Sequence, residues 1–144
     1  MSKLVQFQDV LQFKLLGGAR FLDITADVAG VLSSHRIGLG LVTLFIKHTS
    51  ASLTVQENAD PAVLVDLKRS LQTLAPEGDN YEHSNEGPDD MPAHIKSMLT
   101  ATSLSIPVSN GRMLLGTWQG VYLIEHRSAP HTREVVVHYI GDTG

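Results

Sequence analysis

The sequence contains no cysteine and few aromatic residues, and none of its apolar runs approaches the length of a membrane-spanning helix. Without thiols, neither a disulfide framework nor a cysteine-bound zinc site can form. The first residues, Met1–Phe7, lack the apolar stretch of a signal peptide. We therefore expect a cytoplasmic protein that makes no use of a membrane.

A surplus of positive charge is also missing. Eleven basic and fifteen acidic side chains give a formal net charge of -4, which leaves no cationic excess for a nucleic-acid backbone. The 144 residues, of which 42% are hydrophobic and 18% charged, are typical of one globular domain. We expect a single domain over residues 1–144 and no nucleic-acid partner.

Apolar periodicity divides the chain into strands and helices. Alternating or β-branched segments predict strands over residues 4–16, 39–49, 52–57, 104–108, 113–118, 121–127 and 133–140. Helical spacing and capping residues predict helices over 24–37, 61–75 and 91–99. Short turns between the last strands favour antiparallel pairing. The prediction is an α+β fold, with a large antiparallel sheet or sandwich and about three helices.

Familiar catalytic signatures are absent. The sequence has no His-Glu-x-x-His, no phosphate loop of the Gly-x-x-x-x-Gly-Lys type and no Gly-x-Ser-x-Gly elbow. It does contain seven histidines. Because cysteine is missing, any metal site must use imidazole and carboxylate, and three histidines with one open position would suit a catalytic zinc or a similar ion.

Two strand ends carry polar residues on otherwise buried rows. His48 follows Val42, Leu44 and Ile46, and Glu57 ends the next alternating segment. If these strands pair, the imidazole and the carboxylate meet at one end of the core, as a general base or a metal site requires. The alternative is a buried histidine that is satisfied by a backbone carbonyl.

His94 lies near the start of the predicted third helix, four residues after Asp90. This spacing lets the carboxylate orient the imidazole, or lets it cap the helix while His94 packs. His83, in the polar loop between Pro76 and Asp90, adds a second imidazole that could converge on the same ion; the alternative is a solvated loop side chain.

The last third of the chain offers residues for substrate binding. Trp118, the only tryptophan, and Gln119 lie between glycines, where the backbone can approach a ligand or form a bulge around a core anchor. Glu125 is a carboxylate on a buried row. Arg133, like Arg127, could clamp a phosphate or serve as surface charge. Ser50, after the second strand, is expected to form hydrogen bonds to a turn or a ligand rather than to act as a nucleophile.

Five stretches together resemble one family of small bacterial and archaeal proteins, the YjbQ-like family, described as secondary thiamine-phosphate synthases. They are His48-Thr49-Ser50-Ala51-Ser52-Leu53, Glu57-Asn58-Ala59-Asp60-Pro61, Asp89-Asp90-Met91-Pro92-Ala93-His94-Ile95-Lys96, Leu115-Gly116-Thr117-Trp118-Gln119-Gly120 and Glu125-His126-Arg127. The resemblance extends over essentially the whole chain.

The resemblance implies an α+β fold, a homotrimer and a histidine-containing site that can hold a divalent metal ion, zinc or magnesium. It implies His48, His83 and His94 as metal ligands and His48, Glu57 and His94 as catalytic residues. The residues implied around the substrate are Ser50, Trp118, Gln119, Glu125 and Arg133.

Three functional hypotheses follow. The first, implied by the resemblance, is an enzyme that joins a hydroxymethylpyrimidine pyrophosphate to a thiazole phosphate, with release of pyrophosphate. The second is metal-assisted hydrolysis of a small phosphorylated metabolite. The third is a trimer that binds a small ligand without turnover.

Overall fold

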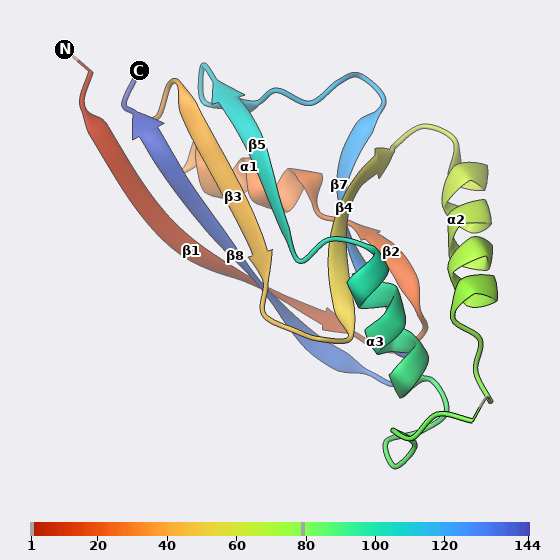
Figure 1. The fold of residues 1–144 in the computed structure, drawn as a ribbon. Helices are drawn as coiled ribbons and strands as arrows, with labels where there is room; N and C mark the ends of the chain where they lie inside the picture. Colours follow the sequence, from red (N-terminus) through yellow and green to blue (C-terminus); the bar gives the residue numbers. More distant parts are fainter. Residues whose placement is uncertain (1, 79) are drawn as a thin grey trace.

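The computed structural model describes residues 2–78 and 80–144 and places them in two antiparallel sheets with three helices (Figure 1). The strands are β1 (Leu4–Leu15), β2 (Arg20–Asp23), β3 (Gly40–Ile46), β4 (Ala51–Glu57), β5 (Ser103–Ser109), β6 (Arg112–Met113), β7 (Gln119–Glu125) and β8 (His131–Asp142). The helices are α1 (Thr25–Ser33), α2 (Pro61–Leu74) and α3 (Asp90–Leu99). The predicted α+β class is confirmed. None of these helices is long and apolar enough to cross a membrane.

The first and last strands lie side by side. The larger sheet has the order β1-β8-β3-β5-β6, so that β8 is paired on both edges, and the smaller sheet has the order β2-β7-β4. β1 and β8 pair from Leu4 opposite Asp142 to Leu15 opposite His131. The two chain ends therefore leave the fold at the same place (Figure 1).

The core forms where the inner rows of both sheets and one face of α1 meet. β3 contributes Val42, Leu44 and Ile46, which are at most 1% exposed, while alternate residues of this strand face outward. The residues that α1 buries are Val28, Val31 and Leu32. This inner row is the one that the alternation predicts.

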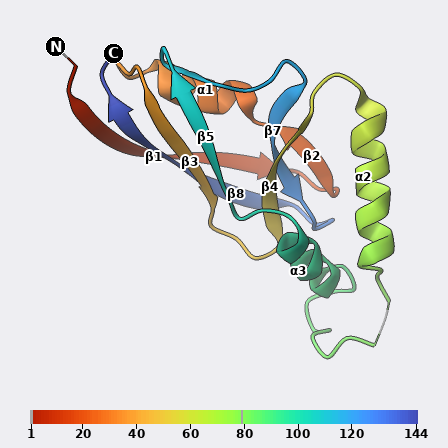
Figure 2. The ribbon, with the colours of Figure 1, turned by 45° about the horizontal axis from the view of Figure 1, so that its top comes forward.

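The strand β3 ends at Ile46, earlier than its predicted end at Thr49. Residues 47–50 instead cross from the larger sheet to β4 in the smaller one, and this connection passes beside α3 (Figure 2). His48 therefore lies on a crossing between sheets. The prediction that its strand pairs with the strand ending at Glu57 is wrong, because β3 and β4 belong to different sheets.

Two further differences concern short strands. β2, which pairs with β7, was not predicted, because its four residues carry no clear alternation. The predicted strand over 113–118 is reduced to β6, which ends at Met113. Residues 114–118 form a loop instead. Two hydrogen bonds between Gly116 and Gln119 close it: the Gly116 amide donates to the Gln119 side-chain oxygen, and the Gln119 amide donates to the Gly116 carbonyl.

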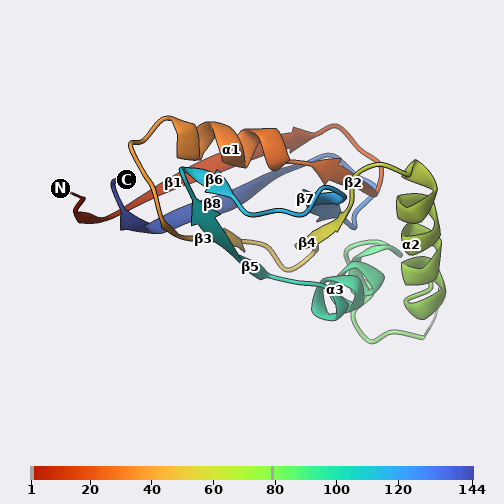
Figure 3. The same cartoon turned by 90° about the horizontal axis from the view of Figure 1, so that it is seen from above.

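The helices α2 and α3 lie next to each other at the side of the smaller sheet (Figure 3). α2 begins as the sequence predicts: the Asp60 carboxylate accepts a hydrogen bond from the Ala62 amide at 3.0 Å, and Pro61 occupies the first helical turn. No residue of α2 is fully buried. α3 is held more closely, with Asp90, Pro92, Ala93 and Lys96 buried.

Candidate metal site on helix α3

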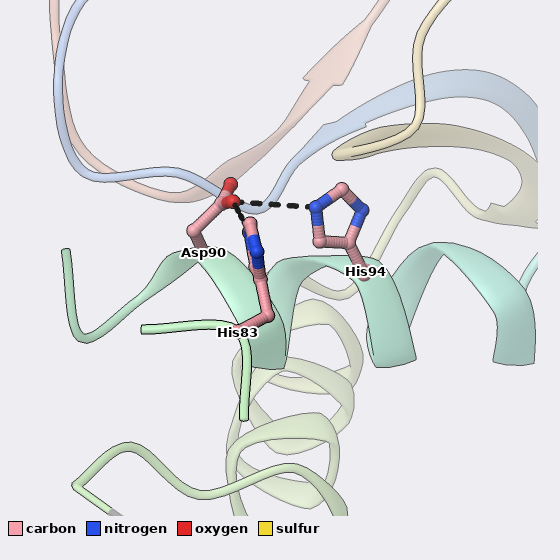
Figure 4. A group of neighbouring side chains, drawn as sticks. All are labelled: His83, Asp90 and His94. Carbon is pink, nitrogen blue, oxygen red and sulfur yellow. Dashed lines mark hydrogen bonds and ion pairs between the residues drawn. The ribbon is translucent and has the colours of Figure 1, made fainter. Parts of the chain in front are cut away.

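Two imidazoles and one carboxylate converge at the start of α3 (Figure 4). One nitrogen of His83, one nitrogen of His94 and one oxygen of Asp90 all lie within 4.8 Å of one another. Asp90 Oδ2 is 2.5 Å from His83 Nε2 and 3.2 Å from His94 Nε2. Asp90 and His94 come from successive turns of α3, and His83 comes from the loop before it. We refer to these three residues as the α3 cluster.

The second nitrogen of His94 has a fixed role. Its Nδ1 lies 2.9 Å from the Thr49 carbonyl oxygen, which can only accept, so that Nδ1 carries the proton and donates. In the neutral ring, the Nε2 lone pair then points at Asp90. A lone pair that faces a carboxylate oxygen is unfavourable unless a proton or a cation lies between them, and a backbone carbonyl at the far nitrogen is the usual partner of a metal-binding histidine.

Arg127 positions the carboxylate of Asp90. Its Nη1 donates to Asp90 Oδ1 at 2.7 Å, which leaves Oδ2 for the two histidines. The same guanidinium donates to Asp89 and to the Glu86 carbonyl. Burial by itself would raise the pKa of Asp90, but the hydrogen bond from His83 and the charges of Arg127 and His94 bring this pKa below its ordinary value. Asp90 is therefore an ionised carboxylate whose orientation is fixed by Arg127.

The α3 cluster lies between two open hollows. His94 lines one of about 490 Å³, together with His48, Thr49, Phe45 and Met98. His83 lines another of about 300 Å³ beside Tyr81 and Met91. The side chains of His83 and His94 are 44% and 32% exposed, whereas that of Asp90 is 6% exposed. A small molecule can therefore reach the histidines from solvent.

His48 is not part of the α3 cluster. It lines the same hollow as His94, but its Nε2 accepts a hydrogen bond from the Glu134 amide at 2.8 Å, which occupies the lone pair a metal would need. Burial, followed by the charge of Arg133, lowers the pKa of His48. The structure thus brings His83 and His94 together with Asp90. His48 is half-buried and its backbone partner is an amide, so it differs from the buried, carbonyl-bound histidine of the sequence alternative.

Arg133, Glu125 and Ser50 form a buried network next to His48. Arg133 donates to both carboxylate oxygens of Glu125, from Nε at 2.6 Å and from Nη2 at 2.5 Å. Its Nη2 also donates to Ser50 Oγ at 3.0 Å. Arg133 is 3% exposed and Glu125 1% exposed. These side chains join β7, β8 and the crossing to β4, and this guanidinium is not open to a phosphate from solvent.

Glu57, Trp118 and Gln119 lie at the opposite end of the smaller sheet. The register pairs Glu57 with Gln119 and Ala51 with Glu125. Because a strand rises roughly 3.3 Å per residue, the two ends of β7 are about 20 Å apart. Glu57 accepts a hydrogen bond from the Ala59 amide, and Trp118 is 65% exposed. The expected meeting of His48 with Glu57 is therefore wrong, and this chain does not bring Trp118 or Gln119 to the α3 cluster.

The sequence analysis did not include Asp90 among the candidate metal ligands, and it did not predict the hydrogen bond from Arg127 to Asp90. The spacing of Asp90 and His94 left two roles open, and the contact between their side chains corresponds to the first, orientation of the imidazole. Asp90 does not cap α3 through its side chain, and Asp89, the residue at the cap position, does not do so either. No local pattern indicates Arg127, because its three acceptors lie 37 to 41 residues earlier in the chain.

Comparison with known proteins gives one consistent family. Residues 10–142 match the family described as UPF0047 protein YjbQ-like. The UPF0047 protein sll1880 of Synechocystis sp. is 51% identical over 95% of this chain and 93% of its own length. The UPF0047 protein YjbQ of Escherichia coli O157:H7 is 48% identical over 83% of this chain and 87% of its own.

Solved structures agree with this result. An uncharacterised conserved protein of the YjbQ/UPF0047 family from Clostridium acetobutylicum is 34% identical, with a TM-score of 0.81, and the match covers 89% of this chain and 97% of that one. A YbjQ-like protein of unknown function from Sulfolobus solfataricus, 19% identical with a TM-score of 0.88 over 96% of this chain and 99% of that one, shares the fold. With matches over nearly its whole length, the chain belongs to the YjbQ-like UPF0047 family.

Proposed function

We propose that the chain is a metal-dependent enzyme that acts on a small phosphorylated metabolite, with a divalent ion held by His83, Asp90 and His94. The observation that carries this proposal is the orientation of His94: Nδ1 donates to the Thr49 carbonyl, and Nε2 faces Asp90 Oδ2 at 3.2 Å. Two imidazoles with one carboxylate suit zinc or a similar transition ion, and they suit magnesium less, because magnesium prefers oxygen ligands.

A divalent ion in this position would offset charge on phosphate oxygens and lower the pKa of a bound water. The residues of the chain supply the remaining functions. Arg127 keeps Asp90 ionised and oriented. Thr49 fixes the ring of His94. The hollow beside His94, of about 490 Å³, leaves room for a small metabolite.

The resemblance to secondary thiamine-phosphate synthases gives the finer proposal, in which a pyrimidine pyrophosphate is joined to a thiazole phosphate. Such a reaction needs a wall on which an aromatic ring can stack. Trp118 lies too far away, but Phe45 lines the hollow beside His94 and is 47% exposed. We therefore assign the stacking role to Phe45 in place of Trp118.

Hydrolysis of a phosphorylated metabolite is the second candidate. The observation that favours it is the number of ligands: three protein groups leave coordination positions open for water, as in catalytic zinc sites. Binding without turnover is the outcome that would contradict both reactions.

The test compares native and chelator-treated protein, reloaded with zinc or magnesium, in two assays: formation of thiamine phosphate by chromatography, and release of phosphate from a panel of small phosphate esters. We expect one bound ion per chain and turnover only in the loaded protein. Asp90→Asn and His94→Ala should each weaken metal binding by at least about 100-fold, since even loss of an outer-shell partner typically costs 10–100-fold.

The matched control is His138→Gln, because His138 lies on β8, outside the α3 cluster, and contacts only Gln6 and Gln8 through its ring nitrogens. This variant should keep the metal content and turnover of the native protein. Equal metal content in the native protein and in Asp90→Asn would contradict the metal site, and turnover that survives complete chelation would contradict the metal-dependent mechanism.

The homotrimer remains a prediction. The observation that supports a homotrimer is an apolar patch on the outer face of the larger sheet, where Leu41, Phe45 and Ile140 are 38%, 47% and 43% exposed. Exposed apolar patches of this kind mark contact surfaces between proteins. We expect sedimentation equilibrium to give three times the chain mass of 15.6 kDa. Leu41→Asp, which places a charge on that face, should shift the protein towards the monomer, and a native protein that sediments as a monomer would contradict the prediction.

A further inference from the structure

Lys96 is a buried cation without a partner. It lies on α3, and the residue as a whole is 8% exposed. Its ammonium makes no hydrogen bond or ion pair within residues 2–78 and 80–144, and it stays in contact with solvent, because no buried side-chain nitrogen or oxygen among these residues lacks a partner. The acidic residues whose charges act on it are Glu77 and Asp89, and neither is in contact with it. Asp89 is already bound by Arg127 and Ser128. The ammonium is therefore available to an anion that enters from solvent.

Lys96 lines a small cavity between α2, α3 and the smaller sheet. Its volume is about 20 Å³, which is enough for one water-sized group. Phe21, Leu71 and Ile124 form its apolar wall.

The polar lining of the cavity is cationic. Lys96, Lys68 and Arg20 contribute three positive charges, and Gln72 contributes an amide. Glu125 also lines the cavity, but Arg133 binds both of its carboxylate oxygens and compensates its charge. His126, the remaining polar side chain, is neutral near pH 7, because burial, with the charges of Lys96 and Arg133, lowers its pKa to about 3.

We propose that this cavity is an oxyanion site that takes a phosphoryl group, with one oxygen inside against Lys96 and the others at the mouth against Lys68 and Arg20. The exposed positions of Lys68 and Arg20 leave the mouth accessible from solvent. The site is distinct from the α3 cluster: Lys96 follows His94 by two residues, which is about 200° around the helix. The inference therefore does not depend on the proposed metal.

The test uses inorganic phosphate as the probe, with chelator-treated protein so that no ion at the histidines can bind it, and with the ionic strength held constant by a large organic anion. Calorimetric titration of the native protein should give saturable binding of one phosphate per chain. Lys96→Met, which keeps the length and the packing of the side chain, should weaken this binding at least about tenfold, as expected for loss of a hydrogen bond to a charged group.

Two further variants keep the test decisive. Lys68→Met changes an exposed residue of α2 and should weaken phosphate binding without affecting folding, so it serves if Lys96→Met does not fold. Lys14→Met removes an exposed lysine of β1 outside the cavity and should bind phosphate like the native protein. No saturable binding by the native protein, or equal binding by the native protein, Lys96→Met and Lys68→Met, would overturn the proposal.

Discussion

Replacing Arg133 by methionine is expected to lower the free energy of unfolding by about 3–5 kcal/mol. The substitution leaves the Glu125 carboxylate, 1% exposed, with only the Arg127 amide as a donor. It also removes the donor to Ser50 Oγ, which lies on the crossing between the two sheets. An uncompensated buried charge is among the most destabilising changes a single substitution can make. Urea denaturation of the native and variant proteins measures the difference.

The control is Arg69→Met. Arg69 pairs with Asp66 on the surface of α2, and the two side chains are 74% and 73% exposed. The Arg69→Met substitution should therefore lower the free energy of unfolding by no more than about 0.5 kcal/mol. The double variant Arg133→Met with Glu125→Gln removes both charges and should recover part of the stability lost in Arg133→Met. Similar unfolding midpoints for the Arg69→Met and Arg133→Met proteins would show that the buried pair is unimportant for stability.

Stability should fall steeply in acid because of one buried histidine. His126 is 4% exposed, and burial, with the charges of Lys96 and Arg133, lowers its pKa to about 3 from an ordinary 6.5. Below pH 6.5 His126 becomes protonated in the unfolded chain, whereas in the folded chain it stays neutral down to about pH 3. The folded state therefore loses stability as the pH falls through this interval. The loss is on the order of 5 kcal/mol over the whole interval, since one pKa unit corresponds to about 1.4 kcal/mol. Above pH 6.5 His126 contributes no pH dependence.

The measurement is the free energy of unfolding of native protein and His126→Asn between pH 7.5 and pH 4, in steps of about half a unit. Asparagine has no proton to gain, so the variant should have the flatter profile even if it is less stable at pH 7.5. His138→Gln is the control, since it removes a partly exposed histidine of β8 and should keep the native slope. Parallel profiles for the native protein and His126→Asn would contradict a neutral, buried His126.

Much of the fold follows from local patterns. The alternation of Val42, Leu44 and Ile46 predicts the buried face of β3, and Asp60 with Pro61 predicts the start of α2. What local patterns do not contain is the sheet to which each strand belongs. The prediction that His48 meets Glu57 assumed that successive strands pair, but β3 and β4 pair with different neighbours. Leu114 and Leu115 are apolar, so the sequence pattern predicts that they belong to a strand. They lie in a loop because no partner strand continues beside them.

The candidate site, like the fold, can be predicted only in part from local sequence patterns. Asp90 and His94 are four residues apart on one helix, so the sequence alone indicates their contact. The position of His83 depends on the path of a polar loop, and the support from Arg127 depends on how β7 ends beside that loop. Neither is encoded in a short stretch of residues. Similarly, the carbonyl of Thr49 becomes a partner of His94 only because the crossing between the sheets passes beside α3.

The pairing of the first strand with the last also determines when the fold can close during synthesis. β8 occupies the position between β1 and β3, so each of these strands has an unpaired edge until β8 has been synthesised and pairs with it. Such edges can pair with other chains, and contacts between distant segments form slowly. The nascent chain is therefore most exposed to misassembly before β8 is available, and the bond between Arg133 and Glu125 forms only once β8 is in place, because Arg133 lies on β8.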